Sequence, residues 1–323
     1  MTPSCTVILC TYQGTAYLSE FLAGVLAQSR LPDRVLVQDD GSTDGTLELL
    51  RDFAAQAPFP VEIRQTPSNL GSTANFADAL AYAAATWPEE VLILADQDDL
   101  WLAEKLEQTL AAFADPTVGA VFSNALLVDE RGRPYAWDLW QSVGFQAGEP
   151  EALFPLLLQK NVVTGATFAC RAGLLPPLLP IPEVWVHDAW LALLLAATSR
   201  VQALPQHLIR YRQHRHQQHG APRWRLRDRL WHACCQRDRR GHLQHWLGAE
   251  LTRIDSALAR LRQLGGSTDC QRQLAGRRHH LANRLALHEK HGWARLALVW
   301  QEWQRGNYQR YANGWPALLK DLW

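Results

Sequence analysis

The sequence contains no hydrophobic run long enough to cross a bilayer. Its longest apolar stretch, Ala189–Ala197, is far below the roughly 20 residues that a membrane span needs. The N-terminal residues lack a basic segment followed by an apolar one, so we expect no secretory signal. No nucleic-acid-recognition motif accompanies the basic residues, which argues against a nucleic-acid partner. We therefore predict a cytoplasmic protein, and leave open a peripheral contact with the inner face of the cytoplasmic membrane.

Cysteine spacing is equally uninformative about metal or disulfide chemistry. The six cysteines show no C-x-x-C pair and no framework of a small secreted domain. Two of them fall inside an apolar strand pattern, which indicates buried thiols in a reducing compartment. The cysteines are Cys5, Cys10, Cys170, Cys234, Cys235 and Cys270.

The formal net charge is zero, but the charges are unevenly distributed along the chain. Residues 1–150 carry roughly three times as many acids as bases, and residues 151–323 reverse this by about two to one. This asymmetry suggests an acidic, metal-assisted half and a basic half that faces phosphate or an anionic surface. After Pro222 the sequence becomes rich in Arg, Trp, Gln and His. We predict a domain at 1–220 and a helical extension at 221–323.

Short apolar strands alternate with helical patterns over the first 125 residues, which predicts a mostly parallel, doubly wound α/β sheet. In such sheets ligands bind beyond the carboxyl ends of the strands. The predicted strands are Thr6–Cys10, Val35–Gln38, Val61–Arg64, Val91–Ala95 and Val118–Ser123. The predicted helices are Tyr17–Gln28, Thr46–Phe53, Thr73–Ala85 and Trp101–Phe113. Residues 138–158 look loop-like, and two later segments, Trp190–Thr198 and Leu208–Gln213, predict a helix and a strand.

Three carboxylates, Asp96, Asp98 and Asp99, end the fourth predicted strand. Their mutual repulsion gives folding alone no reason to group them, whereas Mg²⁺ or Mn²⁺ prefers such oxygen-rich clusters. The alternative is a solvated turn whose aspartates cap the helix Trp101–Phe113. Thr11 and Asp39–Asp40 also follow strands, so all three groups are expected to line one crevice.

The ordered set of motifs resembles the family 2 glycosyltransferases, which use a single nucleotide-binding α/β domain called GT-A. The resemblance covers residues 4–220 and looks most like the rhamnosyltransferase branch. The motifs are V-I-L-C-T-Y-Q-G at 7–14, Q-D-D-G-S-T-D at 38–44, N-L-G at 69–71, D-Q-D-D-L-W at 96–101, H-D-A-W at 187–190 and Y-R-Q-H at 211–214.

The resemblance implies a nucleotide-sugar site. It puts Asp96 on the ribose and Asp98 on a divalent metal, Mg²⁺ or Mn²⁺. Thr11, Tyr12 and Asp39 or Asp40 would surround the base, with Asn69 also at the nucleotide sugar. A simple turn and helix cap is the alternative for Asp39–Asp40.

For catalysis, the resemblance implies that Asp188 takes the proton of the acceptor hydroxyl. The alternative is that Asp188 only caps the following helix. His187 departs from the family, which usually has Glu there. Arg212 and His214 would supply positive charge to the leaving diphosphate, and His216 would ligate the metal.

The complete expectation is an inverting, metal-assisted transferase. It would move a sugar, with L-rhamnose from dTDP-rhamnose as the first candidate, onto a glycan or lipid-linked acceptor. The alternatives are a UDP-hexose donor on the same fold, or a non-catalytic glycan- or membrane-associated module. The Trp- and Arg-rich extension either packs its tryptophans onto a core or second subunit, which we favour slightly, or lies on an anionic bilayer.

Overall fold

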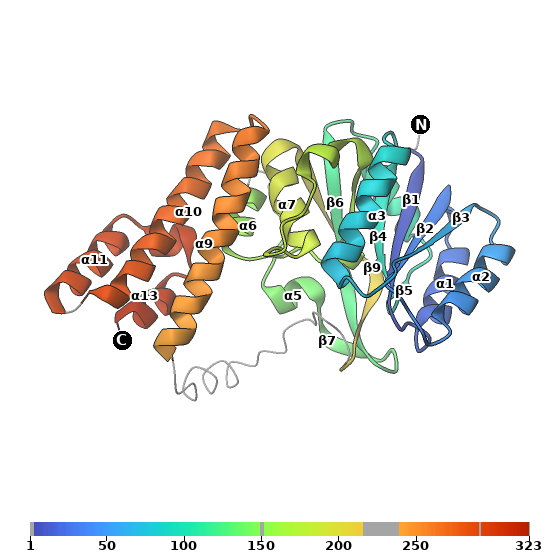
Figure 1. The fold of residues 1–323 in the computed structure, drawn as a ribbon, viewed down its shortest axis with the longest axis horizontal. Coiled ribbons are helices and arrows are strands. Elements are labelled where there is room, and N and C mark those ends of the chain that lie inside the picture. Colours follow the sequence, from blue (N-terminus) through green and yellow to red (C-terminus); the bar gives the residue numbers. More distant parts are fainter. Residues whose placement is uncertain (1–2, 149–151, 216–238, 291, 323) are drawn as a thin grey trace. The chain divides into compact units, whose positions relative to one another are not determined.

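The computed structural model describes residues 3–148, 152–215, 239–290 and 292–322 (Figure 1). These residues form two compact units. The first contains residues 3–148 and 162–215, and the second contains residues 152–161 and 239–322. The second unit thus takes in a short segment, 152–161, that the sequence placed in the first domain.

Four strands of the first unit run parallel in the order β3-β2-β1-β4. Strands β1, β2 and β4 are buried almost throughout, as expected for strands covered on both faces. Helix α3 packs over β1 and β2 with α7 beside it (Figure 1). The elements are β1 (Cys5–Thr11), α1 (Leu18–Leu26), β2 (Arg34–Asp39), α2 (Thr46–Gln56), β3 (Val61–Gln65), α3 (Ser72–Thr86) and β4 (Val91–Asp96). The predicted strands and helices of this half are confirmed.

Beyond β4 the sheet becomes mixed, in the order β4-β8-β6-β9-β5. Strand β8 (Phe168–Arg171) lies between β4 and β6 (Val118–Asp129) and is antiparallel to both. Strand β9 (Arg200–Gln213) is parallel to β6, and β7 (Pro134–Asp138) forms an antiparallel edge. The place of β8 in the sheet was not predicted from the sequence. That place depends on pairing between distant segments, which no local pattern encodes.

The predicted helix at Trp101–Phe113 is wrong in its first turn. Leu100–Trp101 is instead a short strand, β5, paired with Ile209 and Arg210 of β9, and helix α4 begins later (Lys105–Ala112). Trp101 is buried with its ring edge-on to Phe21, so its apolar surface is better buried in the sheet than on a helix. Asp96–Asp99 therefore do not cap α4.

The stretch 138–158 is more regular than the sequence indicated. Asp138 caps a short helix, α5 (Leu139–Val143), in a capping box with Gln141, a signal that sequence reasoning could have used. Helix α6 (Leu153–Gln159) belongs to the second unit. Helix α7 runs from His187 to Thr198.

The second unit is helical, as predicted for the extension. Its other helices are α9 (Arg239–Gln263), α10 (Thr268–Ala286), α11 (Gly292–Gln304), α12 (Asn307–Tyr311) and α13 (Trp315–Leu322). Among the residues described, no helix combines the length and apolarity needed to cross a membrane.

Candidate active site

Strand register brings the predicted residues of β1, β2 and β4 to the same edge of the sheet. Thr11 is paired with Asp39 across β1 and β2, and Cys10 is paired with Asp96 across β1 and β4. The three strands are parallel, so their carboxyl ends meet. Thr11, Asp39 and Asp96 therefore lie at one edge of the sheet, as expected.

Asp39 is fully buried and holds the end of β1 against the turn after β2. Its Oδ2 accepts hydrogen bonds from the hydroxyls of Thr11 (2.8 Å) and Ser42 (2.6 Å), and its Oδ1 accepts one from the Ser42 amide (2.8 Å). Ser42 Oγ in turn accepts a hydrogen bond from the Gln13 amide, and Gln13 has a positive φ of 48°. The two loops are thus tied together by side chains, which fixes the shape of this edge.

Asp40 is also buried, and it holds a different loop. Its Oδ1 accepts a hydrogen bond from the Leu70 amide (2.7 Å) and its Oδ2 accepts one from the Gly71 amide (2.9 Å). Asn69, the predicted ligand in that loop, is exposed. Asp40 therefore supports the loop that presents Asn69.

Gln97 is a site residue that sequence reasoning missed. Its side-chain amide spans the backbone of Tyr12: the Tyr12 N–H donates to Oε1 (3.0 Å), and Nε2 donates to the Tyr12 carbonyl (2.8 Å). A Cβ on Gly14 would lie 2.3 Å from Gln97 Oε1, so a larger residue there would displace the Gln97 side chain. The side chain of Tyr12 remains partly exposed. The middle position of an acidic D-x-D pattern carried no signal for this role.

Negatively charged side chains are concentrated at the end of β4. Burial, followed by the charges of Asp98 and Asp188, raises the pKa of Asp96 to about 7. Burial together with Asp98 and Asp96 raises the pKa of Asp99 well above its usual range. Asp99 Oδ1 accepts a hydrogen bond from the Arg212 amide (3.2 Å), while its buried Oδ2 has no hydrogen-bond partner within the described structure. A cation at this edge would relieve the repulsion among these carboxylates.

The end of β9 closes over this acidic turn. Arg212 is buried, with Nε donating to the Asp98 carbonyl (3.0 Å) and Nη1 to the Glu130 carbonyl (2.7 Å), and it forms an ion pair with Glu20. His214 Nε2 lies 2.6 Å from Asp98 Oδ2, and its ring packs on Tyr17. The structure thus brings together Asp98, Arg212 and His214, while His216 lies outside the described residues.

The donor set suits a hard divalent ion, although the protein does not supply a complete cage. Among the described residues, no three His, Cys, Asp or Glu side chains are placed to hold a metal. Mg²⁺ and Mn²⁺ sites of this kind use one or two carboxylates and complete the shell with substrate phosphates and water. Asp98, with the orphaned Asp99 Oδ2 behind it, fits that pattern.

Asp188 lies in the first turn of α7, and its position is fixed from the turn before β8. Its Oδ2 accepts a hydrogen bond from the Gly165 amide (3.0 Å), and the N-cap residue of α7 is Val186 without a side-chain cap. The capping interpretation of Asp188 is therefore not supported. The charge of Asp188 contributes, after burial and Asp98, to the raised pKa of Asp96.

His187 packs against the same turn. It is buried and stacks on Phe76 with ring centroids 4.2 Å apart. A Cβ on Gly165 would lie 2.7 Å from His187 Nε2. His187, at a position where the family usually has Glu, thus packs against the turn whose Gly165 amide donates to Asp188.

Lys105 is the second residue that sequence reasoning missed. It is almost fully buried, and its ammonium donates to the Ala166 carbonyl (3.1 Å) from a position over the Trp101 ring. Burial, opposed by the charge of Asp99, lowers the pKa of Lys105 to about 8. It connects the acidic turn to the Gly165–Thr167 turn. The sequence pattern around Lys105 indicated only that it lies in a helix.

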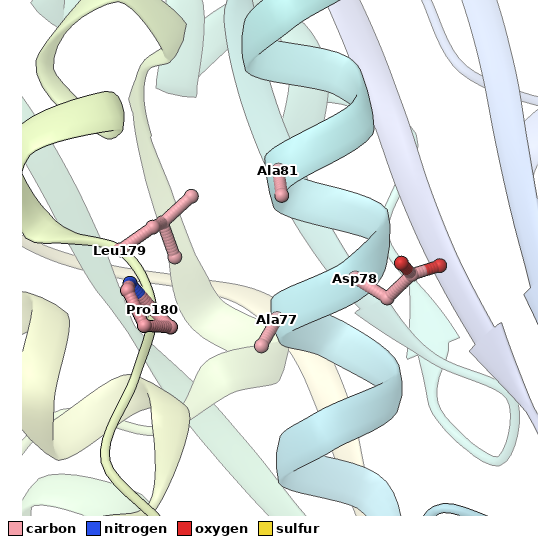
Figure 2. Close-up of a pocket in the computed structure, with 5 residues that line it drawn as sticks. All are labelled: Ala77, Asp78, Ala81, Leu179 and Pro180. Atoms are coloured by element: carbon pink, nitrogen blue, oxygen red, sulfur yellow. The ribbon is translucent and has the colours of Figure 1, made fainter.

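A separate hollow lies away from these residues. It has a volume of about 430 Å³ and lies between α3 and the Leu179–Pro180 segment (Figure 2). Its lining contains Ala77, Ala81 and Asp78, none of which was predicted to bind a ligand. Asp78 is already paired with Arg64 (3.1 Å), so the hollow has little polar chemistry to offer.

The family model for glycosyl transferase family 2 matches residues 6–173, just over half of the chain. The chain belongs to glycosyltransferase family 2. The matched segment contains the ends of β1, β2 and β4 and the Gly165 turn, and the match confirms the family indicated by the sequence motifs.

Curated relatives of this family 2 chain are distant. An uncharacterized glycosyltransferase of Nostoc sp. is 28% identical over 65% of this chain and 64% of its own length. An N-acetylglucosaminyl-diphospho-decaprenol L-rhamnosyltransferase of Mycobacterium tuberculosis is 31% identical over 42% of this chain and 45% of its own. The dTDP-rhamnosyl transferase RfbG of Shigella flexneri is 23% identical over 42% and 46%. The chain spans less than two thirds of the length of the curated relatives that it matches first.

Solved structures agree on the fold of this family 2 member. S. aureus TarS in complex with UDP-GlcNAc has a TM-score of 0.55 at 14% identity, covering 91% of this chain and 78% of that one. The mannosyltransferase PcManGT of Pyrobaculum calidifontis, in complex with GDP-Man and Mn²⁺, has a TM-score of 0.51 at 20% identity, covering 100% and 86%. The predicted GT-A fold with C-terminal helices is confirmed.

Proposed function

We propose that the protein is an inverting glycosyltransferase that moves a sugar from a nucleotide sugar to an acceptor hydroxyl. The observation that carries this is the convergence of Asp96, Asp98 and Asp188 at one edge, with Asp188 held by the Gly165 amide. A non-catalytic module would gain nothing from keeping repelling carboxylates together. These carboxylates therefore favour an enzyme over a non-catalytic glycan- or membrane-associated module.

The nucleotide would lie along the ends of β1 and β2. Thr11, Tyr12 and Asp39 would surround the base, Asp96 would meet the ribose, and Asn69 would approach from the loop that Asp40 supports. Tyr12 offers a partly exposed ring for stacking. Since both Asp39 and Asp40 are engaged with the protein itself, their main contribution is to fix the shape of this pocket.

A divalent ion, Mg²⁺ or Mn²⁺, would be held by Asp98, with His216 as a further candidate ligand. When bound, such an ion supplies Lewis-acid neutralisation of the departing diphosphate. Arg212 would set the backbone of the Asp98 turn, and His214, beside the Asp98 carboxylate, would orient that ligand and present positive charge to the diphosphate.

In the transfer step, Asp188 would take the proton of the acceptor hydroxyl as its oxygen attacks the anomeric carbon. The bond from that carbon to the diphosphate oxygen breaks, and the nucleoside diphosphate leaves with the electron pair. Attack from the face opposite the leaving group inverts the anomeric centre. The Gly165 amide and the buried His187 hold Asp188 in place for this step.

For the donor we propose dTDP-L-rhamnose, with a UDP-sugar as the alternative. Two relatives carry rhamnosyl transfer in their names, whereas the TarS complex contains UDP-GlcNAc. The acceptor would be a glycan or a lipid-linked sugar in the cytoplasm, and the protein would work at or near the membrane.

The test is a thermal-shift panel of dTDP-rhamnose, UDP-glucose, UDP-GlcNAc and GDP-mannose, each with and without Mn²⁺. A donor that binds the native state raises its melting temperature by mass action. We expect one donor to give a metal-dependent shift that Asp98→Asn abolishes and Asp188→Asn retains. Asp188→Asn should lower turnover by at least about a hundredfold. No shift with any donor would contradict the proposal, and NMR of the product's anomeric proton would test inversion.

A further inference from the structure

The C-terminal unit exposes an unusually large apolar surface on two helices. Trp293 of α11 is 87% exposed, Trp300 is 56% exposed, and Trp315 of α13 is 59% exposed. Large apolar side chains gathered in the open usually mark an interaction site. We call this surface the α11–α13 face; its residues are Trp293, Leu296, Trp300, Trp315, Leu319 and Leu322.

The spacing along each helix makes the face continuous. Residues 293, 296 and 300 fall on one side of α11, and residues 315, 319 and 322 fall on one side of α13. Trp303 joins the two helices, since its ring lies 4.7 Å from that of Trp300 and 6.2 Å from that of Trp315. Val299 of α11 and Leu318 of α13, which border this face, pack into the core of the unit. Both helices are therefore amphipathic, with an apolar outer side.

Between residues 292 and 322 the acidic side chains are buried, whereas the exposed charged side chains are basic. The two carboxylates point inward: Glu302 accepts hydrogen bonds from Asn283 (2.8 Å) and Asn307 (2.9 Å) and pairs with His280, while Asp321 pairs with Arg284 (2.6 Å). Arg295 is engaged with the Asp321 carbonyl. Between Gly292 and Leu322, the exposed charged side chains are all basic: Arg305, Arg310 and Lys320.

We propose that the α11–α13 face docks on the surface of an anionic lipid bilayer. Tryptophan favours the boundary between acyl chains and headgroups, and flanking Lys and Arg are attracted to anionic lipid. A second copy of the chain is a poorer occupant, because residues 292–322 expose basic but no acidic side chains, so this segment offers a second copy of itself no opposite charge. The helices are far too short and too polar to span, so they lie in the plane of the interface.

This docking goes beyond the proposed transfer reaction and does not depend on it. It keeps the protein at the surface where a lipid-linked acceptor would be found. Binding is read on vesicles without donor, acceptor or metal, so its failure and a failure of the catalytic proposal are separate outcomes.

The test is flotation of the full chain with vesicles of phosphatidylglycerol and phosphatidylcholine, or of phosphatidylcholine alone. We expect binding to the anionic vesicles that weakens as salt increases. The triple variant Trp293→Ser, Trp300→Ser, Trp315→Ser should weaken binding by about tenfold or more. Replacing Arg305, Arg310 and Lys320 by Gln should weaken it by roughly fivefold per cation at low salt.

Matched variants from exposed positions elsewhere serve as controls. Leu26→Ser, Leu31→Ser, Trp137→Ser controls for lost apolar surface, and Arg51→Gln, Arg131→Gln, Arg272→Gln controls for lost charge. Quenching of tryptophan fluorescence by brominated lipid should occur in the parent and be lost in the Trp triple variant. Equal binding of parent and both triple variants overturns the proposal. A fall in molar mass caused by the Trp substitutions, without any change in vesicle binding, assigns the face to a second copy instead and also overturns it.

Discussion

At the scale of single residues, Asp40 and Lys105 have the same kind of role. The family resemblance implied a base contact for Asp39 or Asp40, and the sequence indicated no role for Lys105. The structure places both in the interior, where each satisfies backbone groups of a loop that carries other site residues. A buried charge is maintained only where partners compensate it. The burial of Asp40 and Lys105 therefore indicates that each side chain supports a loop of the site.

Replacing Asp40 by Ala should leave the Leu70 and Gly71 amides without acceptors. We expect a loss of roughly 2 kcal/mol in unfolding free energy, together with a larger rise in donor KM than fall in kcat. Chemical denaturation and initial-rate kinetics measure the two effects. Asn69→Ala is the control, since this exposed side chain should affect donor KM with a stability change within about 0.5 kcal/mol. Unchanged stability in Asp40→Ala would instead indicate direct ligand contact.

Lys105→Met should remove the donor to the Ala166 carbonyl and disturb the turn that holds Asp188. Turnover is expected to fall by about tenfold or more, with donor affinity in a thermal-shift titration almost unchanged. Because Asp99 affects Lys105 electrostatically, the stability loss should be smaller in an Asp99→Asn background, with a coupling of about 1 kcal/mol or more. Lys290→Met, at an exposed site, is the control. Additive effects of Lys105→Met and Asp99→Asn would refute the coupling.

At the scale of elements, the acidic turn is followed by a strand rather than a helix. The paired backbone of β5 on β9 brings Arg212 and His214 back to Asp98. A helix starting at Trp101 would have left the aspartates as caps. The pairing of β5 with β9 instead places Arg212 and His214 next to Asp98. The local sequence pattern did not predict this arrangement.

The turn Gly165–Thr167 offers a test at this scale. A Cβ on Gly165 would meet His187 Nε2 at 2.7 Å, and His187 cannot move easily because it is buried and stacked on Phe76. We expect Gly165→Ala to shift the amide that binds Asp188 and to lower kcat by about tenfold. Gly24→Ala, where neighbours lie at an ordinary 3.5 Å, should keep full activity. Recovery in Gly165→Ala, His187→Ala would support steric displacement, and an active single variant would exclude it.

At the scale of the whole molecule, both units combine an apolar core with buried charged groups. The first unit buries Asp40, Asp99 and Lys105, and the second contains several buried ion pairs and hydrogen-bonded carboxylates between its helices. Such groups depend on their ionisation state, so the stability of each unit should depend on pH.

Glu302 makes this sensitivity measurable. Burial opposes ionisation, but hydrogen bonds from His280, Asn307 and Asn283 prevail and lower the pKa of Glu302 from 4.5 to about 2. Because the folded-state pKa is depressed, the stabilisation is complete above about pH 4.5 and is lost as pH falls toward 2. Urea unfolding between pH 7 and pH 3 should show a flatter acid slope for Glu302→Gln, by at most roughly 3 kcal/mol. Glu289→Gln, which is exposed, should follow the parent; identical slopes for all three would contradict this.

The sequence by itself determined the family, the parallel strands β1–β4 and the placement of Thr11, Asp39 and Asp96 at strand ends. Strand ends and motif order are local properties, and parallel strands align their carboxyl ends whatever follows them. Tertiary structure alone decided the rest: the antiparallel β8 between β4 and β6, the strand β5, and the roles of Gln97 and Lys105. Each depends on contacts between segments far apart in the chain. The exposure of Trp293, Trp300 and Trp315 belongs here too, because a pattern of Trp and Leu fits a core as well as a surface until packing chooses between them.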